Sequence, residues 1–286
     1  MSGAAALELT VGAALAWAQR AGVDRLDAQM LLAHLLARPR TWLLAHGDAP
    51  LDAPHESAWR AAVARRAGGE PLAYVLGVKE FHGLAFEVNP AVLVPRPDTE
   101  VLVDWALELL VSDLTGQAAP RVIDLGTGSG AVAISVKHAH PTVEVVATDL
   151  STAALDVARR NAQHLGPAVE FGAGSWWGAA RGRRFHLALS NPPYIAQGDP
   201  HLAALQHEPA LALTPGGDGL SALREIVAGA PDHLEAGGWL LLEHGHDQAP
   251  TVRQLLHQRG FGAVTSRSDL AGHARCSGAQ WPPGAG

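Results

Sequence analysis

Three alternate glycines near the middle of the chain form the first pattern with chemical potential. Residues 122–130 are Val-Ile-Asp-Leu-Gly-Thr-Gly-Ser-Gly, so Gly126, Gly128 and Gly130 stand directly after a predicted strand and before a predicted helix. Glycine has no Cβ, which lets the backbone approach a ligand closely, and the first turn of the helix offers free N–H groups. The pattern predicts a loop that binds a nucleotide-like ligand.

An acidic residue stands at the spacing that such a loop requires. Asp149 ends the next predicted strand, nineteen residues after Gly130. A carboxylate at this place can accept hydrogen bonds from both hydroxyls of a ribose. Gly126, Gly128 and Ala131 also satisfy the dinucleotide fingerprint, so a nicotinamide oxidoreductase stays open at this point. A glycine turn that serves only the fold, with Asp149 capping the following helix, is the other interpretation.

A second polar loop follows the fourth predicted strand, with the residues Asn191-Pro192-Pro193-Tyr194. The Asn191 side-chain oxygen and a proline carbonyl can accept the two N–H bonds of a flat –NH₂ group, while the Tyr194 ring packs on its face. An amide nitrogen is a poor nucleophile because its lone pair is delocalised into the carbonyl. Two fixed acceptors would free that lone pair for attack on an electrophile, through positioning and preorganised dipoles.

The elements that hold these loops follow a strand, loop, helix order from Pro97 onward. The candidate strands are 121–125, 143–148, 168–171, 185–189 and 238–243, with helical stretches between most of them. This order predicts an α/β fold with a doubly wound parallel sheet and helices on both faces. In such a sheet the first and fourth strands are neighbours, so the glycine loop and the Asn-Pro-Pro-Tyr loop should share one pocket.

Three segments are expected along the chain. Residues 1–68 show helical spacing, with Asp24 and Asp27 as candidate caps, and predict a small helical domain. Residues 69–96 have the strand-forming content of a hairpin linker, with a turn at Gly83. Residues 97–286 form the main domain; the tail from Phe261 can add an antiparallel pair, and Trp281 begins a frayed end.

Composition excludes several classes of protein. The single cysteine, Cys276, cannot form an intramolecular disulfide or a cysteine-based zinc site, and the histidine pairs at 138/140 and 244/246 lack the companions that a metal site needs. The net charge of −7 is unlike that of proteins bound to phosphate backbones. No apolar run approaches the length of a membrane span. We therefore expect a cytoplasmic protein with no metal, no membrane and no direct nucleic-acid partner.

Longer stretches resemble one family. The family is the bacterial protein-(glutamine-N5) methyltransferases of class 1 release factors, the HemK/PrmC family. Its linker is resembled by Glu70 to Gly77, Glu80-Phe81 and Pro95 to Glu100, its cofactor loop by Asp124 to Gly130, and its catalytic loop by Ser190 to Ile195. Leu241 to Gly245 resembles its fifth strand. The resemblance implies a class I methyltransferase that uses S-adenosylmethionine and releases S-adenosylhomocysteine, with a seven-stranded core, a hairpin and a helical N-terminal domain.

The resemblance also implies roles for individual residues. The cofactor would be held at its methionine and ribose end by the glycine loop, at its ribose by Asp149 and at its adenine by Trp176, with Leu150, Ser175 and Asn191 beside it. In the glycine loop these residues are Gly126, Thr127, Gly128, Ser129 and Gly130. The glutamine of the release factor would be received by Arg96 and by Asn191, Pro192, Pro193 and Tyr194, of which Asn191, Pro192 and Tyr194 would be catalytic. Many members have an acidic residue where this chain has Ser175.

Three alternatives stay open. An N-methyltransferase of adenine or guanine in nucleic acid would share the pocket, but it should need a basic, aromatic-bearing surface to flip a base. A dinucleotide oxidoreductase would use the glycine loop and leave the Asn-Pro-Pro-Tyr loop unexplained. A non-catalytic protein that only senses the cofactor would need the first loop alone.

Overall fold

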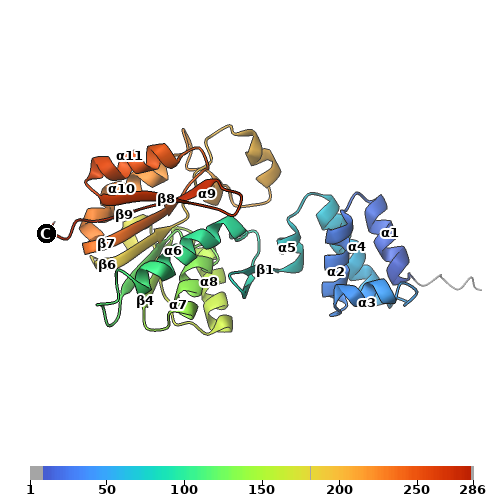
Figure 1. Ribbon diagram of the computed structural model, residues 1–286. Coiled ribbons are helices and arrows are strands. Elements are labelled where there is room, and N and C mark those ends of the chain that lie inside the picture. The colour runs from blue at the N-terminus through green and yellow to red at the C-terminus, as the bar shows by residue number, and fades with distance from the viewer. Residues whose placement is uncertain (1–8, 181, 285–286) are drawn as a thin grey trace, which may run out of the picture. The chain divides into compact units, whose positions relative to one another are not determined.

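The computed structural model describes residues 9–180 and 182–284. The chain forms two compact units, Met1–Val78 and Lys79–Gly286; Figure 1 shows the first in blue to teal and the second in teal through green and yellow to red. Residues 69–96, which we propose as a linker, contain a short helix and a β-hairpin. Among the described residues, no helix has both the length and the apolar character that crossing a bilayer requires.

The first unit is a bundle of helices around a small apolar core. Its helices are α1 (Val11–Arg20), α2 (Arg25–Leu35), α3 (Arg40–Ala45), α4 (Ala53–Ala67) and α5 (Leu72–Leu76). Leu32, Trp59 and Val63 are fully buried in its centre. Asp24 caps α2 by accepting from the Leu26 N–H at 2.7 Å. The prediction of a cap at Asp27 is wrong, because this carboxylate instead pairs with Arg66 on α4 at 2.7 Å.

A hairpin opens the second unit. Strands β1 (Val78–Phe81) and β2 (Leu84–Glu87) pair with each other. The turn lies at His82 and Gly83, both with positive φ, as the glycine predicted.

The second unit then alternates strands and helices. Its remaining strands are β3 (Arg121–Leu125), β4 (Glu144–Asp149), β5 (Glu170–Ala173), β6 (Phe185–Ser190), β7 (Leu234–Glu243), β8 (Gly262–Ser268) and β9 (Ala274–Gln280). Its helices are α6 (Glu100–Val111), α7 (Ala131–Ala139), α8 (Thr152–Leu165), α9 (Ala210–Leu213), α10 (Ser221–His233) and α11 (Ala249–Arg259), with 3₁₀ turns η1 (Pro97–Thr99), η2 (Trp176–Ala179) and η3 (Pro200–Leu205).

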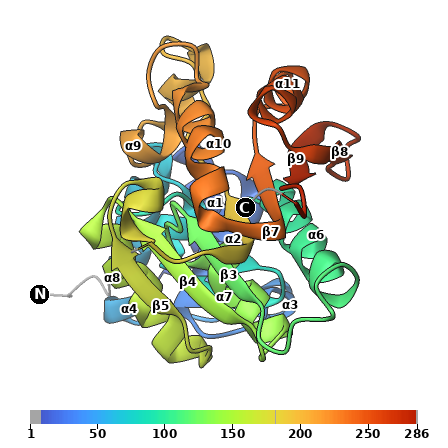
Figure 2. The same ribbon diagram turned by 90° about the vertical axis from the view of Figure 1, so that its left-hand side faces the viewer.

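The strands β3 to β9 form one mixed sheet of seven strands within the described ranges. Its order is β5-β4-β3-β6-β7-β9-β8 (Figure 2). Strands β3 and β6 are parallel neighbours, with Leu125 opposite Ser190, so the predicted adjacency of the first and fourth strands is confirmed. Strand β9 runs antiparallel between β7 and β8, which confirms the expected pair at the C-terminal end. The doubly wound α/β fold is therefore as predicted.

Alternate residues of the central strands enter two separate cores. Val122 and Leu187 pack with α6 and α7 on one face, whereas Ile123 and Ala188 pack with α10 and α11 on the other. A strand buried on both faces is apolar at nearly every position, which is why these segments could be recognised in the sequence.

Two expectations for the part of the sheet that contains β7 and β9 differ from the structure. Strand β7 begins at Leu234, before the predicted position 238, because Leu234 already pairs with Phe185 ahead of a register shift. The prediction of a frayed end is wrong at Trp281. Its N–H donates to the Gly238 carbonyl at 2.7 Å and its ring packs edge-on against Phe261, so the pairing of β7 and β9 continues past the strand end.

Candidate active site

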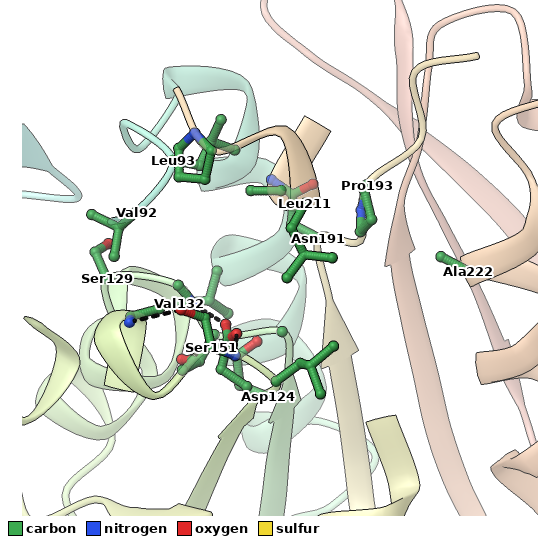
Figure 3. Close-up of a pocket in the computed structure, with 18 of the residues that line it drawn as sticks. Val92, Leu93, Asp124, Ser129, Val132, Ser151, Asn191, Pro193, Leu211 and Ala222 are labelled. Carbon is green, nitrogen blue, oxygen red and sulfur yellow. Dashed lines mark hydrogen bonds between the residues drawn. The ribbon is translucent and has the colours of Figure 1, made fainter. Parts of the chain in front are cut away.

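A cavity of about 380 Å³ opens at the carboxyl ends of β3, β4 and β6, within the second unit. This volume lies within the usual range for small-molecule sites. Residues of the glycine loop, the end of β4, the segment before η2, the Asn-Pro-Pro-Tyr loop and the segment around α9 line it (Figure 3). The two predicted loops therefore share one pocket, as the strand order required.

The glycine loop lies at the floor of the cavity. Gly126, Gly128 and Gly130 all have positive φ, which residues with a side chain rarely adopt. A Cβ on Gly126 would lie 3.2 Å from the Trp176 ring, and one on Gly128 would point into open space. Gly126, Thr127, Gly128 and Ser129 line the cavity. The loop therefore leaves its backbone accessible to a ligand.

Gly130 has a different place. It is not among the described residues that line the cavity, and a Cβ on it would lie 2.8 Å from Ile134 Cδ1 and 3.3 Å from Ala158 Cβ. Its missing side chain therefore lets α7 and α8 approach the loop. A contact between Gly130 and a ligand stays a prediction.

A buried carboxyl group braces the same loop. Asp124, next to the end of β3, accepts hydrogen bonds from Thr127 Oγ1 at 2.6 Å and from the Ala133 N–H at 3.2 Å. Burial raises the pKa of Asp124 to about 7, and these two hydrogen bonds act in the opposite direction. Asp124 precedes the glycine loop in the predicted motif, but its place on the cavity wall was not among the expected contacts.

Asp149 ends β4 beside the loop. Its Oδ2 accepts from the Gly128 N–H at 2.9 Å and its Oδ1 accepts from the Ser151 N–H at 2.8 Å. Burial raises the pKa of Asp149, while backbone hydrogen bonds from Ser151, Gly128 and Leu150 lower it. A carboxylate has about four acceptor sites, so these bonds do not use all of them. Asp149 lines the cavity together with the exposed Leu150.

The two adjacent tryptophans have separate roles. Trp176 lines the cavity beside Ser175. Trp177 points into the core, where its Nε1 donates to the Ile226 carbonyl at 2.9 Å and its ring stacks on His233. Trp176 is therefore the tryptophan that is placed to contact a ligand.

The Asn-Pro-Pro-Tyr loop closes another side of the cavity, where Asn191 and Pro193 line it. The Asn191 Nδ2 donates to Thr99 Oγ1 at 3.1 Å, so its Oδ1 is the atom available to accept from a substrate. Thr99 belongs to η1 and was not among the predicted site residues.

Tyr194 lies behind the wall of the cavity. Its ring packs against the core that contains α10 and α11, and its hydroxyl donates to Glu243 Oε1 at 3.3 Å. Burial raises the pKa of Tyr194 above its ordinary value, so the group is a neutral donor. Pro192 is buried, and neither residue is among the described lining residues. Their contact with a substrate stays a prediction.

Arg96 lines the cavity and forms an ion pair with Glu208, whose side chain is 2% exposed. Glu208 also accepts from the Val94 N–H at 3.0 Å. These contacts tie the segment before η1 to the segment around α9, which places the apolar side chain of Leu211 at the cavity. The sequence carried no local signal for this pair, because the two residues are far apart in the chain.

The described residues contain no group of three or more His, Cys, Asp or Glu side chains that could hold a metal ion.

Known proteins are similar to this chain over nearly its whole length. Residues 13–77 match the PrmC N-terminal domain family and residues 99–220 match the methyltransferase small domain family. A release factor glutamine methyltransferase of Bordetella pertussis is 54% identical over 260 residues, which cover 90% of this chain and 95% of the relative. The enzyme of the same name from Burkholderia pseudomallei is 50% identical over 269 residues, which cover 91% and 93%.

Among solved structures, the T. thermophilus 16S rRNA N2 G1207 methyltransferase in complex with AdoMet and guanosine is similar in fold. It aligns with a TM-score of 0.52 and 19% identity, over 71% of this chain and 49% of that chain. At this identity the likeness shows the fold alone.

Proposed function

The chain belongs to the release factor glutamine methyltransferase family and is a methyltransferase. We propose that it transfers a methyl group from S-adenosylmethionine to the side-chain amide nitrogen of the glutamine in the Gly-Gly-Gln motif of class 1 translation release factors. The oxidoreductase alternative falls away with the family assignment. One observation carries the residue roles: Asn191 and the glycine loop line one cavity.

The cavity fits S-adenosylmethionine in size and in the chemistry of its wall. The glycine loop offers backbone at close range, the Asp149 carboxylate keeps lone pairs for the ribose hydroxyls, and the Trp176 ring offers an apolar face for the adenine. Ser175, with Leu150 nearby on the wall, completes the proposed cofactor contacts. When bound, this cofactor would supply a methyl group on a sulfonium, whose carbon–sulfur bond breaks in the transfer to leave the thioether S-adenosylhomocysteine.

The residues of the chain position the acceptor nitrogen. The Asn191 Oδ1 accepts one N–H of the glutamine amide, and we assign the second N–H to the Pro192 carbonyl. Both acceptors are fixed before the substrate arrives, because the Asn191 Nδ2 is already engaged by Thr99 and the prolines stiffen the loop. The Tyr194 ring and Pro193 support the amide from the side, and Arg96 contacts the substrate near the cavity mouth. The proton is lost to water after the amide nitrogen has become methylated.

A large protein substrate agrees with the cavity. Its wall includes Val92, Leu93 and Leu211, and Leu211 is 57% exposed. A glutamine on an exposed loop can enter as an extended side chain, while the cost of ordering that loop is offset by contacts elsewhere on the release factor. We place the protein in the cytoplasm, where translation occurs.

The test is methyl transfer with isotope-labelled S-adenosylmethionine and purified release factor, followed by mass spectrometry of the Gly-Gly-Gln peptide. We expect one methyl group on the glutamine, and none on a matched release factor in which that glutamine is replaced by alanine. Label on an adenine or guanine of duplex nucleic acid, with none on the release factor, would support the base methyltransferase instead.

A further inference from the structure

Glu243 is a buried acid directly behind the cavity. It is the last residue of β7, whose neighbour β6 leads into the Asn-Pro-Pro-Tyr loop, and it is 1% exposed. Its Oε1 accepts from the Tyr194 hydroxyl at 3.3 Å, whereas its Oε2 has no hydrogen-bond partner among the described residues. A carboxyl group kept in such a place costs desolvation energy, which suggests that it serves the neighbouring site.

Thr99 connects this acid to the cavity. Its Oγ1 accepts from the Asn191 Nδ2 at 3.1 Å, which leaves the hydroxyl proton of Thr99 available to another acceptor. Thr99 acts to lower the pKa of Glu243, so the two side chains are neighbours, and the Glu243 carboxyl has a buried oxygen with no partner among the described residues. We assign the Thr99 proton to this carboxyl. In this arrangement Tyr194 and Thr99 donate to one carboxylate, and Asn191 donates to Thr99.

We propose that Glu243 is a positioning residue, which acts through Thr99 to hold the side-chain amide of Asn191 with Oδ1 turned toward the substrate. We call the hydrogen bonds from Asn191 to Thr99 and from Thr99 to Glu243 the relay. An ionised carboxylate only accepts hydrogen bonds, so the relay can run only in this direction. If it ran the other way, Thr99 would donate to the Asn191 Oδ1, and the Asn191 Nδ2 would face the cavity. The Asn191 –NH₂ group would then face the N–H groups of the reacting amide, and two donors cannot form a hydrogen bond with each other. This role rests on the proposed function of Asn191.

The groups around Glu243 determine when it is ionised. Burial raises its pKa to about 7; the hydrogen bonds from Thr99 and Tyr194 and the nearby Arg275 act to lower it, and Asp98 acts to raise it. Cys276 lies opposite Glu243 on β9, and burial keeps that thiol protonated. Below about pH 7 the carboxyl gains a proton that it can donate, so the relay loses its fixed direction.

Two measurements test this proposal. The first is the single-turnover rate of methyl transfer at saturating S-adenosylmethionine. The second is the NMR signal of the Asn191 side-chain amide, which is identified by its loss in the spectrum of Asn191→Asp. Glu243→Gln should lower the single-turnover rate about tenfold or more, since a small misplacement of the acceptor is costly, and should leave cofactor affinity unchanged. It should also remove the fall in rate below about pH 7. Thr99→Val should show the same loss of rate, and Thr99→Ser should restore it. Glu235→Gln, at the opposite end of β7, is the matched control.

The spectra report on the relay without any substrate. In the wild-type protein the Asn191 amide resonances should shift with a midpoint near pH 7, and in Glu243→Gln and Thr99→Val this titration should vanish. Unchanged rates and an unchanged Asn191 titration in both variants would overturn the relay. If the wild-type protein methylates no release factor but the titration behaves as expected, the proposed substrate fails while the relay stands.

Discussion

The Asp149 Oδ2 accepts a hydrogen bond from the Gly128 N–H at 2.9 Å, so the acid at the end of β4 holds the loop that follows β3. Strands β3 and β4 are neighbours in the sheet, which brings these two residues together. Asp149 therefore acts on a ligand in two ways, through its own lone pairs and through the shape of the glycine loop.

The first prediction concerns cofactor affinity. Asp149→Ala should weaken S-adenosylmethionine binding by about 1–3 kcal/mol, because acceptors for ribose hydroxyls and for the Gly128 N–H are lost together. Asp149→Asn should also weaken it, since one oxygen becomes an –NH₂ group that faces a backbone N–H. Calorimetry measures both, with Asp156→Ala as the control, because Asp156 is exposed on α8 and pairs only with Arg159 among the contacts of the described residues. Tight NAD binding with no S-adenosylmethionine heat would contradict the cofactor assignment.

The second prediction concerns Asn191. Replacing it with alanine removes one preorganised acceptor from the reacting amide, so the single-turnover rate should fall by at least about 100-fold. Cofactor affinity should stay near the wild-type value, because the glycine loop and Asp149 are untouched. Rapid-quench methyl transfer measures the rate. A near-normal rate in Asn191→Ala would remove this residue from the chemistry.

The sequence could predict those parts of the site that are local in the chain. The glycine loop, Asp149 and the Asn-Pro-Pro-Tyr loop each stand at a strand end, and the alternation of strands and helices predicts the order that joins them. The family resemblance assigned Trp176 to the adenine, and in the structure Trp176 lines the cavity whereas Trp177 packs in the core.

The parts that could not be predicted depend on contacts between distant segments. The bond from Asn191 to Thr99 spans 92 positions, and the pair of Arg96 and Glu208 spans 112. Nothing in the residues near Glu208 indicates that its carboxylate is buried against Val94 and Arg96. Similarly, Trp281 has the turn residues Pro and Gly after it, and only the pairing of β7 with β9 explains why it is held.

The third prediction is the effect of pH on stability at Glu243. The pKa of this carboxyl is about 7 in the folded protein and 4.5 ordinarily. Between these values the folded state binds a proton that the unfolded state has lost, so the free energy of unfolding falls as pH rises. Below about pH 4.5 Glu243 is protonated in both states and does not lower the free energy of unfolding. Above about pH 7 it is ionised in both states, and the free energy of unfolding is lower by about 3 kcal/mol.

Glu243→Gln should therefore gain stability relative to the wild-type protein as pH rises, by about 2–3 kcal/mol between about pH 5 and about pH 8. Asp124, His186 and His244 also titrate with shifted pKa values, but they are present in both proteins and cancel in the difference. Urea unfolding at a series of pH values measures this difference. A stability difference that stays constant with pH would show that Glu243 has an ordinary pKa.

The last prediction separates a protein substrate from a nucleic acid. Intact release factor should be methylated far better than a short peptide with the same Gly-Gly-Gln, because remote binding energy orients the reacting centre. With a net charge of −7, the chain should depend little on phosphate contacts, so added salt should reduce activity only modestly. An enzyme that relies on several such contacts would lose affinity by orders of magnitude between about 50 and about 200 mM salt. Methyl transfer to release factor, peptide and duplex DNA across that range measures both effects; efficient and steeply salt-sensitive labelling of DNA alone would refute the glutamine assignment.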